Sequence, residues 1–261
     1  MVEQVIRTGE RIVLLSEGGM KIAVLIEEGT RKVPGIGVFD TSQLVGQRYG
    51  TIARIGNRRF TILRPSIVDR VETLRRKAQI ILPKDAALII MNCDIRAGNL
   101  VIEGGSGSGA MTTALANTIW PDGKVISYDI RADFSKQAKE NIETLGFANV
   151  VTFKEGDVCV PGTIREKDVD AVVLDIPEPW RALKNVYDAL KPCGHLACYT
   201  PNVNQVEQTV RALQEMDFIE IFTIEALIRE MVVVEKGIRP AFDMLGHSGY
   251  LTFARKVLEK M

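Results

Sequence analysis

From residue 99 onward the sequence alternates between short apolar runs and amphipathic stretches, and this alternation limits the fold more than any other feature. Short β-branched runs predict buried strands, whereas an apolar period of three to four residues predicts helices. The predicted strands are "NLVIEGG", "GKVISYD", "VVTFKEGD", "VDAVVLD" and "GHLACYT", and two more strand-like runs follow, "FIEIFTIEAL" and "GYLTFARKV". Strands that alternate with helices pair in parallel. We therefore predict an α/β fold with a doubly wound sheet.

The first 65 residues follow a different pattern. The runs "RIVLL", "KIAVLI", "TIARI" and "RFTILR" are β-branched and apolar, and turn sequences such as "VPGIG" separate them. This pattern predicts a small antiparallel β domain over residues 1–65. Residues 66–98 are predicted as a helical connector, in two helical pieces broken at Pro83, and residues 99–261 as the second domain.

The composition predicts a folded cytoplasmic protein without a membrane or a metal. Of the 261 residues 46% are hydrophobic, yet no stretch reaches the length of a membrane span. The first ten residues, "MVEQVIRTGE", lack the basic and apolar regions of a signal peptide. The four cysteines form no C-x-x-C pair, so we expect reduced thiols and no zinc site.

Positive charge is concentrated at the N-terminal end, although the net charge is zero. Residues 1–78 carry 14 Lys and Arg against 8 Asp and Glu. The excess is densest from Arg54 to Lys77. Such asymmetry is typical of a nucleic-acid-binding face, and it is also compatible with an ordinary solvated surface.

A glycine-rich loop, "VIEGGSGSGA" over residues 101–110, follows the first predicted strand of the second domain and begins a helix. Its glycines allow tight turns and close approach of a ligand to the backbone. Asp129 ends the next strand, where a carboxylate can accept hydrogen bonds from both hydroxyls of a ribose. The loop and the acid together predict a site for a nucleoside-bearing cofactor.

The identity of that cofactor is less constrained. Gly105, Gly107 and Ala110 also fit the dinucleotide pattern G-x-G-x-x-G/A, so an NAD-dependent oxidoreductase stays an alternative. Glu103 would repel a pyrophosphate, but it could orient loop amides or attract a cation. S-adenosylmethionine carries a nucleoside and a cationic sulfur without a phosphate, and an acidic, glycine-lined loop suits it better.

The segment "VVLDIPEPW" places an acid, two prolines and a tryptophan at the end of the fourth predicted strand. Asp175 would lie where ligands bind in such sheets. Pro177 and Pro179 fix two φ angles and remove two donors, which predicts a stiff loop with free carbonyls. Trp180 offers a plane on which a base could stack. In the simpler alternative, Asp175 caps the next helix and Trp180 belongs to the core.

Six segments in order resemble the tRNA adenine-N1 methyltransferases of archaea and bacteria. They are "QIILPKDAALI", "VIEGGSGSGAMT", "VISYDIRADFSKQAKENI", "VVLDIPEPW", "ALKPCGHLACYTPNVNQV" and "RPAFDMLGHSGYLTFARK". The resemblance spans about Gln79 to Lys256. It implies a class I methyltransferase sheet, mostly parallel with an antiparallel last strand, and S-adenosyl-L-methionine as cofactor. It also implies a tRNA substrate, methylated at position 58 of the T-loop or at 57 and 58, and a homotetramer.

The resemblance assigns site residues one position at a time. Asp129 corresponds to the ribose acid and Asp175 to the acid of the catalytic pocket. Phe134 stands where the family often has a polar or basic residue, so a side-chain hydrogen bond is not expected there. The other expected cofactor contacts are the backbone of Ile81, the loop residues Glu103, Gly105, Gly107, Ser108, Gly109, Ala110 and Met111, and the adenine-side residues Asp157 and Val158.

The chemistry of the acceptor suggests roles for further residues. An adenine must leave its stack to be methylated, and its N1 becomes part of a cationic ring. We expect Asp175 to accept a hydrogen bond from the exocyclic amine and to stabilise that charge. Tyr199, Asn202 and Trp180 are weaker candidates for the target-base pocket. His195 is expected to be structural, the role of His247 is open, and Arg229, Arg239 and the basic stretch are candidates for phosphate contacts.

Two alternatives share the fold or the substrate. One is a methyltransferase for adenine N6 or protein isoaspartate, although Ile176 and Glu178 depart from the D/N-P-P-aromatic loop that is typical of the former. The other is a noncatalytic RNA-binding subunit, which the glycine loop, Asp129 and Asp175 disfavour.

Overall fold

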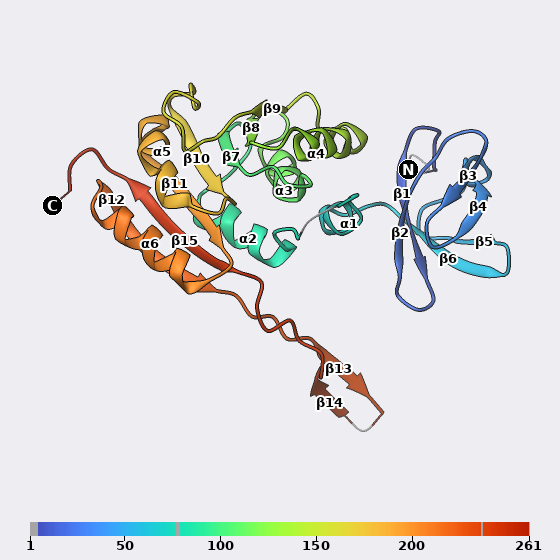
Figure 1. Ribbon diagram of the computed structural model, residues 1–261. Coiled ribbons are helices and arrows are strands. Elements are labelled where there is room, and N and C mark those ends of the chain that lie inside the picture. The colour runs from blue at the N-terminus through green and yellow to red at the C-terminus, as the bar shows by residue number, and fades with distance from the viewer. Residues whose placement is uncertain (1–4, 77–78, 236, 261) are drawn as a thin grey trace. The chain divides into compact units, whose positions relative to one another are not determined.

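The computed structural model describes residues 5–76, 79–235 and 237–260 (Figure 1). The chain divides into two compact units, Met1–Leu74 and Arg75–Met261. The stretch predicted as a connector is therefore shared, since α1 (Ile67–Glu72) belongs to the first unit and α2 (Pro83–Asn92) to the second.

The first unit contains a four-stranded antiparallel sheet with the order β2-β1-β6-β5. Its strands are β1 (Arg11–Ser16), β2 (Lys21–Leu25), β5 (Ile52–Ile55) and β6 (Arg58–Leu63), which correspond to the four β-branched runs. A hairpin of β3 (Thr30–Val33) and β4 (Gly37–Asp40) leads into the short helix η1 (Thr41–Leu44). Side chains from both sheets fill one apolar core, including Ile12, Leu14, Phe39, Phe60 and Ile62.

The helical stretch before Pro83 is shorter than the sequence predicts. Ser66 and Asp69 form a reciprocal capping box at the start of α1, which ends at Glu72. Residues 79–82 are not helical. Pro83 is the first residue of α2, a position where its missing N–H costs nothing because no helical partner exists there. The proline thus begins a helix instead of breaking one.

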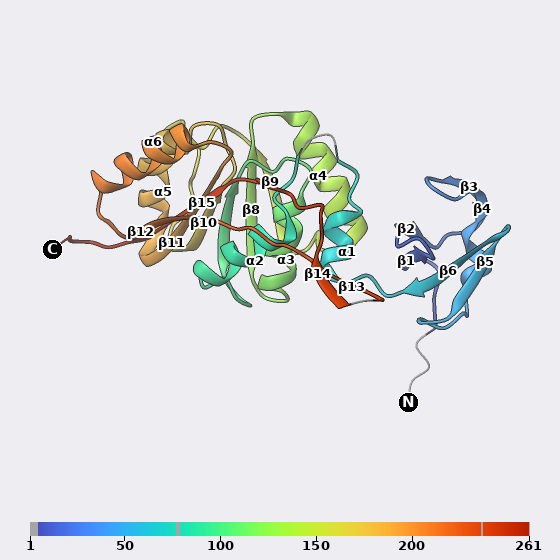
Figure 2. The ribbon, with the colours of Figure 1, turned by 90° about the horizontal axis from the view of Figure 1, so that it is seen from below.

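The second unit is a seven-stranded sheet with the order β12-β15-β11-β10-β7-β8-β9 (Figures 1 and 2). The strands are β7 (Leu100–Gly104), β8 (Lys124–Asp129), β9 (Val151–Glu155), β10 (Val169–Leu174), β11 (Leu190–Thr200), β12 (Phe218–Glu225) and β15 (Tyr250–Lys256). The last strand, β15, runs antiparallel to both neighbours, and the pairs between β11 and β9 are parallel. The predicted sheet is confirmed, with its antiparallel strand inserted beside the edge strand β12.

Helices cover the two faces of this sheet. α2 and α3 (Ala110–Ile119) contact each other, and α3 also contacts α4 (Ala132–Leu145). The short η2 (Pro179–Ala182), α5 (Leu183–Ala189) and α6 (Val203–Gln214) form the second group. Figure 2 shows α2 and α3 on one side of the strands and α5 and α6 on the other. This arrangement leaves the carboxyl ends of the strands for a ligand.

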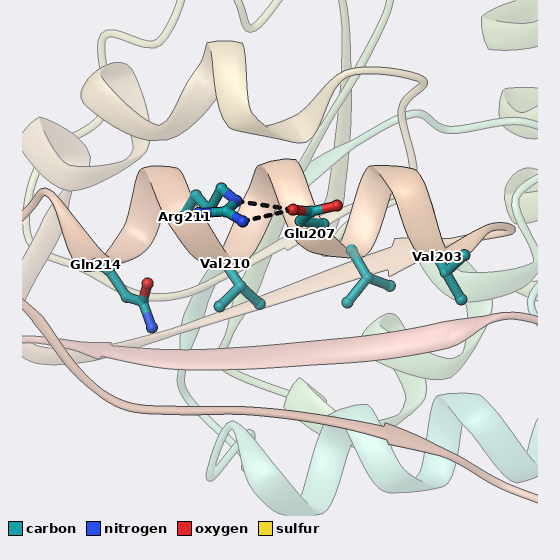
Figure 3. A pocket seen from close by; sticks show the side chains of 6 residues that line it. Val203, Glu207, Val210, Arg211 and Gln214 are labelled. Atoms are coloured by element: carbon teal, nitrogen blue, oxygen red, sulfur yellow. Dashed lines mark hydrogen bonds and ion pairs between the residues drawn. The ribbon is translucent and has the colours of Figure 1, made fainter.

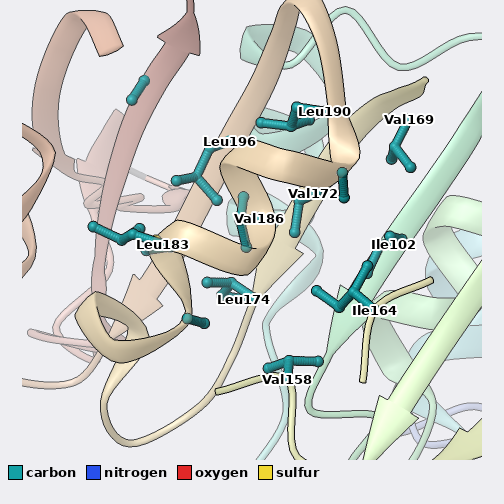
Figure 4. Close-up of a cluster of buried hydrophobic side chains, with 14 of the residues drawn as sticks. Ile102, Val158, Ile164, Val169, Val172, Leu174, Leu183, Val186, Leu190 and Leu196 are labelled. Atoms are coloured by element: carbon teal, nitrogen blue, oxygen red, sulfur yellow. The ribbon is translucent and has the colours of Figure 1, made fainter. Parts of the chain in front are cut away.

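The core beneath α5 fixes the central strands in register. Val172 and Leu174 of β10, Leu196 of β11 and the α5 residues Leu183 and Val186 are all fully or almost fully buried in one cluster (Figure 4). Burial of each such side chain contributes about 1.5–3 kcal/mol. Because parallel strands buried on both faces need continuous apolar runs, "VDAVVLD" becomes a central strand of the sheet.

The alternation pattern does not predict the hairpin that lies between β12 and β15. It consists of β13 (Met231–Val234) and β14 (Gly237–Pro240), which pair antiparallel with each other. The apolar side chains of this hairpin are unusually exposed, with Val233 78% and Ile238 67% accessible. No helix among the described residues is long and apolar enough to span a membrane.

Candidate active site

The glycine loop and two acids meet at the carboxyl edge of the sheet. In the parallel register Gly104 pairs with Tyr128 of β8 and with Leu174 of β10. Asp129 and Asp175, each one residue further, therefore flank the loop from the neighbouring strands. The order of strands brings together three features that lie far apart in the sequence.

Gly105 is the point of closest approach in the loop. Its N–H donates to the Tyr128 carbonyl at 2.8 Å, and the Asp175 N–H donates to the Gly104 carbonyl at 2.8 Å. Gly105 has φ +93°, and a Cβ there would lie 2.1 Å from the Asp175 carbonyl oxygen. Only glycine allows this contact between the two backbones, which sets the loop beside Asp175.

The Asp129 carboxylate holds two backbone segments, the glycine loop after β7 and the turn after β8. Its Oδ2 accepts from the Gly107 N–H at 3.1 Å and its Oδ1 accepts from the Arg131 N–H at 2.9 Å. The residue is only 7% accessible. Each carboxylate oxygen has two lone pairs, so both oxygens can still accept from ribose hydroxyls. This donor–acceptor chemistry fits the nucleoside that the sequence predicts.

Glu103 of β7 is almost completely buried, with 1% of its surface accessible. Its Oε2 accepts from Thr112 Oγ1 at 2.6 Å and from Ser127 Oγ, which also contacts Ser106 Oγ. Oε1 has no hydrogen-bond partner among the described residues. Burial raises the pKa of Glu103 to about 8, with smaller contributions from the nearby charges of Asp175 and Asp129.

Glu103 does not have either role that the sequence suggests, orienting the loop amides or attracting a cation. The structure joins it to a cluster of three hydroxyl groups, so it does not orient the loop amides by hydrogen bonds. With a pKa of about 8 it is mostly neutral at pH 7, and its pull on a cation is correspondingly weak. Ser106, Thr112 and Ser127 were not predicted as part of this site; their small polar side chains on buried segments were the available signal.

Asp175 presents a carboxylate without a side-chain partner among the described residues. Its surface is exposed, yet enough protein surrounds it that burial raises its pKa to about 7, helped by the negative charge of Asp129. The following helices begin after Glu178 and Ala182 without a side-chain cap, so the capping alternative for Asp175 is wrong. A partly desolvated carboxylate near its titration point is typical of a functional group.

The next expected cofactor residues belong to the end of the glycine loop and the start of α3. Gly109 has φ +82° and precedes α3, in whose first turn Ala110 and Met111 are buried. Ser108 is buried, and its carbonyl accepts from Asn141 Nδ2 at 2.9 Å.

The remaining expected cofactor residues lie on α4, after β9 and before α2. Phe134 in the first turn of α4 is covered by the Arg131 guanidinium, 3.4 Å from the ring centroid. Asp157 Oδ1 accepts from the Cys159 N–H at 2.8 Å, and Val158 belongs to the core cluster. Ile81 is buried before α2.

The weaker acceptor-side candidates sit on two adjoining loops. Tyr199 is buried at the end of β11 and donates to the Ser248 carbonyl. Burial raises its pKa to about 12, and Asp85 and Asp175 are close enough to add to this shift. Asn202 caps α6 by accepting from the Gln205 N–H at 3.1 Å. Trp180 is half-buried in η2.

The two loops are tied together. Gln205 Nε2 donates to the Pro177 carbonyl at 2.7 Å, so this carbonyl does not stay free as the sequence suggests. The segment after Asp175 is thereby fixed to the first turn of α6. Among the described residues, no group of three or more His, Cys, Asp or Glu could hold a metal ion.

A hollow on α6 is lined by other residues. Figure 3 shows its lining, which comes from α6 alone: Val203, Val206, Glu207, Val210, Arg211 and Gln214. Glu207 and Arg211 form an ion pair across one helical turn, as expected for a solvated face. None of the predicted site residues lines this hollow.

Comparison with known proteins places the chain in a family. Residues 70–239 match the family described as tRNA methyltransferase complex GCD14 subunit. The tRNA (adenine(57)-N(1)/adenine(58)-N(1))-methyltransferase TrmI of Methanocaldococcus jannaschii is 39% identical over 223 residues, covering 75% of this chain and 78% of that protein. A tRNA (adenine(58)-N(1))-methyltransferase TrmI of Thermus thermophilus is 33% identical over 197 residues, covering 76% and 77%.

Solved structures agree on the fold. A SAM-dependent O-methyltransferase of Thermotoga maritima superposes with a TM-score of 0.90 at 34% identity, covering all of this chain and 98% of that one. The tRNA (m1A58) methyltransferase TrmI of Aquifex aeolicus has a TM-score of 0.82 at 24% identity, covering 98% and 100%, and supports the fold alone. On the sequence match and the shared fold, this chain belongs to the tRNA methyltransferase complex GCD14 subunit family.

Proposed function

We propose that this protein transfers a methyl group from S-adenosyl-L-methionine to N1 of an adenosine in the T-loop of tRNA, at position 58 or at 57 and 58. The observation that carries the proposal is the exposed Asp175 carboxylate, held by backbone contacts beside the glycine loop. The names of the relatives from Methanocaldococcus and Thermus support the acceptor.

On the cofactor side, Asp129 would accept from the ribose hydroxyls. The backbone of the glycine loop would approach the rest of the molecule, and Asp157 and Val158 would border the adenine. When bound, the cofactor would supply a methyl group on a cationic sulfur, which can leave as a neutral thioether that keeps the bonding electron pair. Gly107 leaves the loop backbone uncovered, since no atom lies within 4 Å of a Cβ there.

On the acceptor side, Asp175 would accept a hydrogen bond from the exocyclic amine and turn N1 toward the methyl group. The ring becomes cationic as N1 is methylated, and an ionised carboxylate stabilises that charge. Because the pKa of Asp175 is about 7, its ionised fraction rises steeply near neutral pH. The residue therefore orients the base and offers electrostatic stabilisation without a covalent step.

The pocket for the extruded base needs side chains that form its walls, in addition to the Asp175 carboxylate. Tyr199, Asn202 and Trp180 are proposed to form them, with Trp180 as the stacking surface. Tyr199 is held by Ser248 and Asn202 by the start of α6, so both have fixed positions.

We assign phosphate contacts to the basic residues of the first unit and of the segment that follows it. Arg54, Arg58, Arg59, Arg64, Arg75 and Arg76 are exposed, while Lys77 lies outside the described residues. Arg229 and Arg239, beside the β13–β14 hairpin and within it, are the second group. Affinity that depends on such contacts falls steeply with salt concentration.

Self-association is part of the proposal. The hairpin and its flanks expose Leu227, Ile228, Val233, Ile238 and Phe242, and a solvent-facing group of this size is typical of a protein interface. A homotetramer, as in the family that the sequence resembles, would bury it. All four cysteines are free thiols in this chain, and a cytoplasmic location suits both them and a tRNA substrate.

The experiment identifies the product. The protein is incubated with S-adenosyl-L-methionine and an unmodified tRNA transcript. The tRNA is then digested to nucleosides, which are separated by chromatography and identified by mass spectrometry. 1-Methyladenosine, mapped to position 58 or to 57 and 58 by fragment analysis, is the expected product. A methylated ribose or another methylated base would contradict the proposal, and the former would favour oxygen as the acceptor, as the name of the Thermotoga relative states.

A further inference from the structure

His247 makes two contacts that determine its protonation. Nδ1 lies 2.6 Å from Glu225 Oε1, and Nε2 lies 2.8 Å from the Pro201 carbonyl oxygen. A carbonyl oxygen only accepts, so Nε2 must carry a proton. If Nδ1 were bare, its lone pair would face a carboxylate. The imidazolium form satisfies both contacts.

The ring joins three parts of the second unit. Glu225 ends β12, Pro201 lies in the loop between β11 and α6, and His247 shortly precedes β15. The ring also packs against Tyr250, with centroids 4.9 Å apart. The contact thus fixes the β11–α6 loop to the end of β12.

The next two residues hold the same loop. The Ser248 carbonyl accepts from the Tyr199 hydroxyl, and Ser248 Oγ accepts from Lys84 Nζ at 2.7 Å. Gly249 lies so close to the Tyr199 ring that a Cβ would be 2.4 Å from Cζ. The motif "GHSGYL" therefore clamps the segment from Tyr199 to Pro201.

The clamped segment leads directly to the acceptor side. Asn202 follows Pro201 and caps α6, and Gln205 in the first turn donates to the carbonyl of Pro177. Pro177 is two residues from Asp175. A displacement of Pro201 would move the start of α6 and the segment that carries the acceptor carboxylate.

We propose that His247, as an imidazolium bridging Glu225 and the Pro201 carbonyl, is a positioning residue for the target base. It acts through the β11–α6 loop and touches no reacting atom. The inference rests on the proposed function, since it names the residue that sets the geometry of the acceptor side.

The charges around the ring decide how it responds to pH. Glu225 raises the pKa of His247 most, the Pro201 carbonyl raises it further, and the ammonium of Lys84 on α2 lowers it. Lys84 is itself paired with the buried Asp85. Tyr250 packs its ring against the imidazole. Because the folded pKa is raised above 6.5, the clamp is complete at lower pH and loosens as pH rises through that pKa.

The experiment combines a titration with kinetics on the full chain. The protein has two histidines, so a histidine-labelled sample gives two sets of ring signals, assigned with His195→Gln and His247→Gln. Burial lowers the pKa of His195. We expect His247 to titrate above 6.5 and His195 below it, and Glu225→Gln to lower the pKa of His247.

The kinetic arm separates positioning from folding. His247→Gln should lower the rate of tRNA methylation about tenfold or raise the KM for tRNA, with cofactor affinity unchanged, while His195→Gln behaves as wild type. Glu225→Gln should move the alkaline limb of the pH–rate profile by the same amount as the His247 pKa. An unmoved limb, or a wild-type rate for His247→Gln, overturns the inference. Absence of 1-methyladenosine from the wild-type reaction contradicts the proposed function instead, and the titration still tests the ion pair.

Discussion

The carbonyl oxygen of Asp175 lies against the backbone of Gly105, closer than any side chain would permit. This contact joins the cofactor loop after β7 to the acceptor loop after β10. A Cβ at residue 105 would be 2.1 Å from that oxygen and would also sit on a left-handed backbone.

We predict that Gly105→Ala separates the two loops. The left-handed conformation alone costs about 1–2 kcal/mol, and overpacking adds about 1–3 kcal/mol. Thermal unfolding and calorimetric titration with S-adenosyl-L-methionine measure the two effects. Gly98→Ala is the matched control, because residue 98 has φ +84°, has nothing within 4 Å of a Cβ and lies outside the glycine loop. Equal losses in the two variants would contradict the contact.

Asp129 should be required for cofactor affinity. Asp129→Ala removes the acceptor for two ribose hydroxyls and for the N–H groups of Gly107 and Arg131. A hydrogen bond to a charged group is worth about 1.5–3 kcal/mol, so affinity should fall at least tenfold. Asp133→Ala removes an exposed carboxylate from the next helix and should leave affinity unchanged. Similar dissociation constants for both variants would rule out the assigned role.

Glu103 should make the folded state less stable as pH rises. Its folded pKa is about 8 against 4.5 in the unfolded chain, so between these values the native state binds the proton more strongly. The stability that the bound proton contributes is complete below pH 4.5 and is lost as the pH rises to 8, on the order of 5 kcal/mol for a fully buried group.

The matching variant is Glu103→Gln, which keeps an acceptor for Thr112 and Ser127 and does not titrate. Its stability relative to wild type should increase from pH 5 to pH 8.5 in chemical denaturation. A stability difference that stays constant over this range would mean that Glu103 is ionised in the folded protein.

Gly249→Ala tests the packing of Tyr199. The added methyl would lie 2.4 Å from Tyr199 Cζ, and the ring is buried, so overpacking should cost about 1–3 kcal/mol. We expect a lower melting temperature and slower tRNA methylation at unchanged cofactor affinity. Gly246→Ala is the control in the same segment, since no atom lies within 4 Å of a Cβ there. An unchanged rate in Gly249→Ala would argue against Tyr199 as a wall of the pocket.

The sheet could be predicted because its signals are local. Continuous apolar runs such as "VDAVVLD" specify buried parallel strands, and the acids Asp129 and Asp175 lie where strands end. Whichever strands are adjacent, such residues reach the same edge of a parallel sheet. The approach of Gly105 to Asp175, in contrast, depends on which strands are neighbours.

The features that were missed depend on contacts between distant segments. The burial of Glu103 and its partners Thr112 and Ser127 come from packing of α3 and β8 against β7, which no local pattern records. The β13–β14 hairpin buries no core face of its own, so it lacks the alternation that marks the other strands. The clamp by His247 joins residues more than 20 positions apart.

The central claim is that ionised Asp175 orients the target adenine, and Asp175→Asn tests it most directly. Single-turnover methylation of tRNA is measured from pH 6 to 9 with saturating cofactor, beside the control Glu178→Gln, which removes an exposed carboxylate of the same loop. We predict that the wild-type rate rises with pH through about 7, the pKa of Asp175, on the acidic side of the alkaline limb that His247 sets. Asp175→Asn should lose this rise and be about 100-fold slower with unchanged cofactor affinity. A variant Asp175→Asn that methylates tRNA at the wild-type rate, with the same pH profile, would contradict the account.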